Sequence, residues 1–155
     1  LAAAGLANLV RLARWRGLAV RRELPLFALH LGYGWLTLGL VLLGLAGVGL
    51  VPDAAALHSL GAGAIATMVL AVMARTVLGR RDFGRATRAG LAAMLLAAHL
   101  ATFLRVGAVA LPASYGPLLA ASGIAWIAGF ALFALVCGPF LAMRSSQSKL
   151  DGSPN

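Results

Sequence analysis

The amino-acid sequence predicts an all-α protein, a polytopic bundle of transmembrane helices with four complete spans and the end of a preceding one. The composition is 61% hydrophobic and only 11% charged, with a mean hydropathy of +0.93, which is far too apolar for an ordinary soluble domain. In addition, all of the thirteen Lys and Arg residues except Arg105 fall into three short clusters, which long apolar runs separate. This pattern is typical of membrane proteins, because uncharged runs insert into lipid and basic residues stay in the connectors.

The first apolar segment, residues 1–10, is too short to cross a bilayer and has no signal-peptide pattern. We expect it to be the end of an earlier helix, so that the chain is the C-terminal portion of a larger membrane protein. Four later runs each have at least the roughly 20 residues that a spanning helix needs. They form one transmembrane domain with predicted spans at residues 24–48, 54–78, 89–111 and 117–142. Turn residues at 112–117 separate the last two.

The connectors between these spans predict the orientation of the chain. The basic clusters, at residues 11–22, 75–88 and 144–149, all fall on one side of the membrane. The opposite connectors, around residues 51–53 and 112–115, contain no Lys or Arg. The positive-inside rule therefore places the basic side, with the polar tail at 143–155, in the cytoplasm.

Several functional classes are excluded by composition and motifs. The net charge of +9 does not indicate a nucleic-acid partner, because the basic residues interrupt hydrophobic runs instead of forming one continuous polar face. Cys137 is the only cysteine, so the chain alone cannot form a disulfide or a Cys-based zinc site. A Ser/His/Asp set, a phosphate-binding Gly loop followed by Lys, and an HExxH motif are also lacking. Any chemistry would therefore depend on a cofactor.

Ionisable side chains within the spans are costly, so each requires an explanation. In the first span, His30, Gly34 and Thr37 share one helical face, and Tyr33 flanks them. We expect this polar stripe to face the bundle, where His30 could bind a metal or haem through one ring nitrogen. Hydrogen bonding between helices is the alternative role.

The second and third spans carry two more histidines and two methionines. His58 lies about 6 Å below the outer rim of its span at 1.5 Å per residue, so it is either a ligand or a wet interfacial side chain. His99 lies in the middle of its span, with a functional or a hydrogen-bonding role. Met68 and Met73 are soft enough to bind copper, and filling gaps in the core is their alternative role.

Two arginines also fall within the predicted spans. Arg75 lies at the cytoplasmic end of its span, where its long side chain can reach the interface. Arg105 is the only basic residue in the outer half, where the positive-inside rule would exclude an idle one. An anionic partner, either Asp53 or a cofactor carboxylate, would explain it, and outward snorkelling is the alternative.

Several segments together resemble the C-terminal half of the NnrS family. The segments are HLGYGWL (30–36), ALH (56–58), GAIATM (63–68) and AVMAR (71–75), with RLARWRG (11–17), LRV (104–106) and the ending DGSP (151–154). Arg80 departs from this pattern, because the family often has a histidine there. Ala66 stands where a glycine is common, and His99 matches no consistent histidine of the family.

The resemblance implies a polytopic protein of the bacterial inner membrane that contains haem and copper and takes part in the response to nitric oxide and in protection from nitrosative stress. Its partners would be membrane lipid, N-terminal helices of the same protein, and nitric oxide. The positions that match the family patterns are His30, Tyr33, Trp35, His58, Met68, Met73, Arg75 and Arg105.

From these positions we expect a cofactor site formed by His30, His58, Tyr33 and Arg105, in which Arg105 pairs with a haem propionate. The expected metal ligands are His30, His58 and Met68. The resemblance does not imply a catalytic mechanism, and two other functions remain open. The chain could be a transporter subunit whose histidines and arginines line a substrate path, or a non-catalytic structural membrane subunit.

Overall fold

The computed structural model describes residues 1–15, 17–79 and 84–151, and within these ranges it contains helices and turns but no strand. The all-α prediction is therefore confirmed. Arg16, Arg80, Arg81 and most of the DGSP ending lie outside the described residues. The elements are α1 (Ala2–Arg14), η1 (Gly17–Val20), α2 (Leu24–Ala46), α3 (Asp53–His58), η2 (Ser59–Ala66), α4 (Thr67–Leu78), α5 (Arg85–Ala110), η3 (Pro112–Ser114) and α6 (Tyr115–Asp151).

Four segments are long and apolar enough to cross a membrane, as the sequence predicts. They are Leu24–Ala46, Asp53–Leu78, Arg85–Ala110 and Pro112–Ala142. The second is continuous but not uniform, because the turns of η2 between α3 and α4 are π-helical. π-helical turns are wider than α-helical ones, and they often occur at functional sites.

The last helix differs from the prediction at both ends. The helix begins at Tyr115, two residues before the predicted start at Pro117, and Pro117 lies in its first turn, where a proline has no intrahelical hydrogen bond to lose. At the other end α6 continues through the predicted polar tail to Asp151. No glycine or proline interrupts residues 140–151, so no residue with an intrinsic preference for ending a helix occurs before Gly152.

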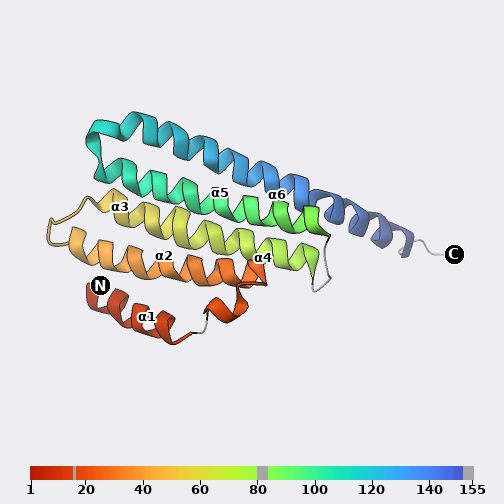
Figure 1. The fold of residues 1–155 in the computed structure, drawn as a ribbon, viewed down its shortest axis with the longest axis horizontal. Coiled ribbons are helices and arrows are strands. Elements are labelled where there is room, and N and C mark those ends of the chain that lie inside the picture. Colours follow the sequence, from red (N-terminus) through yellow and green to blue (C-terminus); the bar gives the residue numbers. More distant parts are fainter. Residues whose placement is uncertain (16, 80–83, 152–155) are drawn as a thin grey trace.

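The helices lie side by side in the order of the chain (Figure 1). The short helix α1 packs on α2, the α3–η2–α4 span packs on the other side of α2, and α5 lies between that span and α6. Successive spans run in opposite directions, so the connectors at 47–52 and at η3 lie together at one end. The described residues before α2 and at the start of α5, which carry basic residues, lie at the opposite end, as the charge pattern requires.

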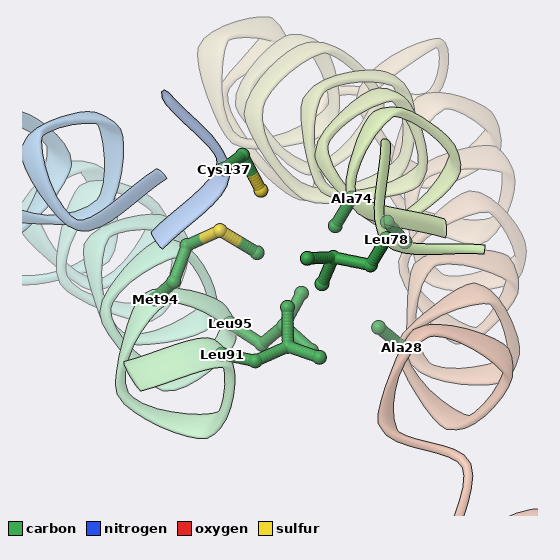
Figure 2. Packing of buried hydrophobic residues seen from close by; sticks show 8 residues of the cluster. Ala28, Ala74, Leu78, Leu91, Met94, Leu95 and Cys137 are labelled. Atoms are coloured by element: carbon green, nitrogen blue, oxygen red, sulfur yellow. The ribbon is translucent and has the colours of Figure 1, made fainter. Parts of the chain in front are cut away.

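The core fills the basic end of the bundle, between α2, α4, α5 and α6. Its buried members are Ala28, Ala71, Ala74, Leu78, Leu91, Met94, Leu95 and Cys137. Figure 2 shows these side chains converging from four helices, with Cys137 inside the cluster. Cys137 is a free thiol buried among apolar groups. It therefore serves as a core residue, because reactive cysteines need an exposed and electropositive setting.

Small residues set the spacing between α2 and its neighbours. A Cβ atom built on Gly63 would lie only 2.6 Å from the Trp35 ring, so η2 contacts that ring directly through its backbone. On the opposite side of α2, a Cβ atom on Gly5 of α1 would lie 2.7 Å from the Val41 side chain. Close approach through small residues is the usual way in which membrane helices gain packing energy.

We predict that Gly63→Ala destabilises the bundle by about 1–3 kcal/mol, because the added methyl group has to displace a buried indole. Gly61→Ala is the matched control, since it lies in the same element and a Cβ atom there meets no atom within 4 Å. The measurement is the free energy of unfolding in mixed micelles. Equal stability of the two variants would contradict the close contact.

Candidate functional site

The three histidines of the chain lie in different parts of the bundle. Cβ contacts fix the register between the first two spans, because Gly39 faces Leu60 and Gly32 faces Met68. His58 therefore lies near the level of Val41, eleven residues from His30 along α2. That separation is about 16 Å at 1.5 Å per residue, so His30 and His58 do not share one ligand site.

His30 lies on the side of α2 that faces α1 and η1. A Cβ atom built on Gly17 would lie 3.0 Å from the imidazole, and Trp15 meets the ring edge-on with 5.8 Å between ring centroids. The predicted stripe continues along this side, because Leu12 packs over Gly34 and Gly5 approaches the Thr37 carbonyl. The polar stripe of His30, Gly34 and Thr37 is therefore covered by α1 and the residues that follow it.

The two ring nitrogens of His30 differ in their hydrogen bonding. Nδ1 lies 2.9 Å from the carbonyl oxygen of Leu26, one helical turn earlier. A carbonyl oxygen only accepts hydrogen bonds, so Nδ1 carries the proton and Nε2 of the neutral ring keeps its lone pair. Histidines that bind metals donate their second ring N–H in this way. His30 is therefore in the form that can act as a ligand.

Tyr33 belongs to the same neighbourhood as His30. Its hydroxyl group donates a hydrogen bond to Oδ1 of Asn8 on α1, and its ring lies 4.9 Å from that of Trp15. The guanidinium of Arg11 lies over the Trp15 ring, 5.4 Å from its centroid. We call Asn8, Trp15, His30 and Tyr33 the inner polar cluster. It joins α1 to α2 near the basic end.

His58 and Arg105 form a second group at the outer end of the bundle. Both side chains are partly buried, and α3 packs directly on α5. Arg105 lies close enough to His58 for its positive charge to act on the imidazole. The structure therefore brings these two predicted site residues together.

The two methionines do not complete a metal site with the histidines. Met68 packs against Gly32, which faces the second span, whereas His30 faces α1 from the other side of the helix. Met73 is 44% exposed. Within the described part of the chain, no group of three or more His, Cys, Asp or Glu side chains could hold a metal ion.

The best-defined polar contact was not among the expected site residues. Trp35 donates a hydrogen bond from Nε1 to Nδ1 of His99, over 3.1 Å, and both side chains are buried. An indole N–H can only donate, so Nδ1 of His99 accepts and the proton of the neutral imidazole sits on Nε2. His99 therefore has the opposite tautomer to His30. The available sequence signal was the mid-span depth of both residues, but it does not reveal their pairing.

We compared the chain with known proteins. A family model described as NnrS protein matches residues 1–144. Neither the curated proteins nor the solved structures gave a match.

We predict that Trp35→Phe costs about 1–3 kcal/mol of stability, because it leaves the buried Nδ1 of His99 without a donor. Trp126→Phe is the matched control, since Trp126 is a partly buried tryptophan on α6 that packs on Phe130. Unfolding followed by circular dichroism in micelles measures both variants. A smaller loss for Trp35→Phe than for Trp126→Phe would contradict the assigned hydrogen bond.

Proposed function

We propose, because the chain belongs to the NnrS family, that it is the cofactor-binding membrane portion of a haem- and copper-containing protein of the nitric oxide response. The chain is a membrane-type helical bundle, and the family match extends over all four spanning segments. Haem, copper and protection from nitrosative stress are the parts of the proposal that go beyond these findings.

One observation in the structure supports a cofactor role most directly, namely the hydrogen bonding of His30. Its Nδ1–H is engaged by the Leu26 carbonyl, which orients the ring and leaves the Nε2 lone pair available. Trp15 and Gly17 hold the ring from the side of α1. A ligand held in this way keeps its orientation before the cofactor arrives.

The outer pair offers a cofactor carboxylate a separate point of attachment, about 16 Å along α2 from the level of His30. Arg105 places a positive charge in a half that has no other Lys or Arg, and a propionate would supply the missing negative charge. When bound, haem iron would supply a centre that takes diatomic ligands, and copper a soft centre for electron transfer. The chain itself would orient, anchor and shield these groups.

The absorbance spectrum of the purified full-length protein tests the proposal. We expect a Soret band and stoichiometric copper by metal analysis. A protein without either would refute a haem- and copper-based function.

We predict that His30→Gly lowers haem or copper affinity by at least about tenfold, because even loss of a partner behind a ligand costs that much. Free imidazole should restore binding in this variant, since it supplies the same nitrogen ligand. His58→Ala should lower occupancy as well. Unchanged occupancy in both variants would remove the assignment of these histidines.

We predict a bacterial inner-membrane location with the C-terminus in the cytoplasm. Green fluorescent protein fused after Asn155 should fluoresce, and alkaline phosphatase fused there should be inactive. Phosphatase inserted at Gly49, in the connector without basic residues, should be active. The reverse pattern would invert the orientation.

A further inference from the structure

His99 is a buried polar side chain in the middle of the bundle that the proposed cofactor site does not use. It is 8% exposed, and it lies near the centre of α5. Its Nε2 is buried and has no hydrogen-bond partner in the described chain. Buried donors nearly always have an acceptor, and the requirement is strongest within a membrane, where water is absent.

Trp35 holds His99 in one protonation form. The indole N–H occupies Nδ1 as a donor, so the neutral ring must carry its proton on Nε2. The indole itself is held by two neighbours, because the Phe103 ring lies 4.5 Å away between centroids and the Gly63 backbone packs closely against the indole. A metal ion would need a lone pair on Nε2, and Trp35 prevents this.

The neighbouring hydroxyl groups are engaged elsewhere. Each of the five buried hydroxyls in the described spans donates to a backbone carbonyl, and none accepts from Nε2. The pairs are Thr37 with Gly34, Ser59 with Trp35, Thr67 with Gly63, Thr102 with Ala98, and Ser122 with Ala101.

The π-helical turns of η2 lie at the same level as this donor. Gly63, which contacts Trp35, is in the middle of η2, and Ser59 at its start donates to the Trp35 carbonyl over 3.0 Å. π-helical turns cost stability relative to α-helix and are retained mostly at functional sites. An unpartnered donor and an irregular helix thus coincide at one place.

We propose that the N–H group at Nε2 of His99 is the donor of a binding site for a small neutral molecule with one acceptor atom, and that Trp35 is its positioning residue. Nε2 is enclosed by the protein, so a guest reaches it only when neighbouring side chains move slightly, and this restricts the guest to one or two heavy atoms. It has to be neutral, because Trp35, Phe103 and Gly63 offer no charge to an ion at this depth. Arg105 lies six residues away on α5, about 9 Å along the helix.

Two molecules share this chemistry, namely water and nitric oxide, and the second rests on the proposed function. Both have a lone pair and one or two heavy atoms. A metal ion and a carboxylate are excluded, the first by the tautomer and the second by its charge. The experiment therefore has to report the tautomer first and then the guest.

The test is nitrogen NMR of the full-length protein labelled with ¹⁵N-histidine in lipid bilayers, with His99→Gln to assign the signals. We expect His99 to show one protonated nitrogen, Nε2, while His30 shows Nδ1 protonated. Trp35→Phe should lose this single form, with the proton shared between both nitrogens. Trp126→Phe should leave the His99 signals unchanged.

The guest is then identified under argon and under nitric oxide. Magnetisation transfer from water to Nε2–H under argon identifies water. Absence of that transfer, with broadening of the His99 signals by paramagnetic nitric oxide, identifies the diatomic. An unprotonated Nε2, or a protonated one with neither response, overturns the proposal. Since the tautomer is read without haem, a protein that lacks a Soret band but shows this site would refute only the proposed function.

Discussion

The hydrogen bond between Trp35 and His99 is the contact on which the arrangement of the spans depends. It joins α2 to α5 across the α3–η2–α4 span, whose Gly63 backbone lies against the same indole ring. In hydrocarbon neither ring can turn to water, so each polar nitrogen has to find its partner inside the protein. The pair therefore fixes three spans in depth and in rotation. The level of the outer Arg105 and His58 pair follows from that register, whereas contacts between α1 and α2 place the inner polar cluster.

This register divides the histidines into three separate tasks. His30 faces α1, with its proton held on Nδ1 and its Nε2 lone pair available. His58 is near Arg105 at the outer end, where the charge of Arg105 acts on its ring. His99 is a donor at the centre, because Trp35 occupies its Nδ1. Three residues of one type thus differ in function because each meets a different neighbour, and the imidazole ring has two distinct nitrogens.

The sequence predicts the spans well and the site only in part, for a physical reason. A span needs only enough apolar residues in a row, which is a local property that the chain displays directly. The stripe of His30, Gly34 and Thr37 is local too, so the shared face was predictable, but its covering helix was not. Trp35 and His99 are 64 residues apart in the sequence, and their pairing depends on how α2 and α5 are each rotated about their own axes. No spacing rule within one helix contains that information.

The π-helical turns of η2 add a second reason. Each residue of a segment with i→i+5 hydrogen bonds rotates less about the helix axis than in an α-helix. Side chains before and after Ser59–Ala66 therefore point in different relative directions from those that a regular α-helix would give them. His58 precedes this segment and Met68 follows it. The angle between these two side chains about the helix axis therefore differs from the angle in a regular α-helix. Gly63 lies within this segment, and a residue with a side chain would not fit there, because its Cβ atom would lie 2.6 Å from the Trp35 ring.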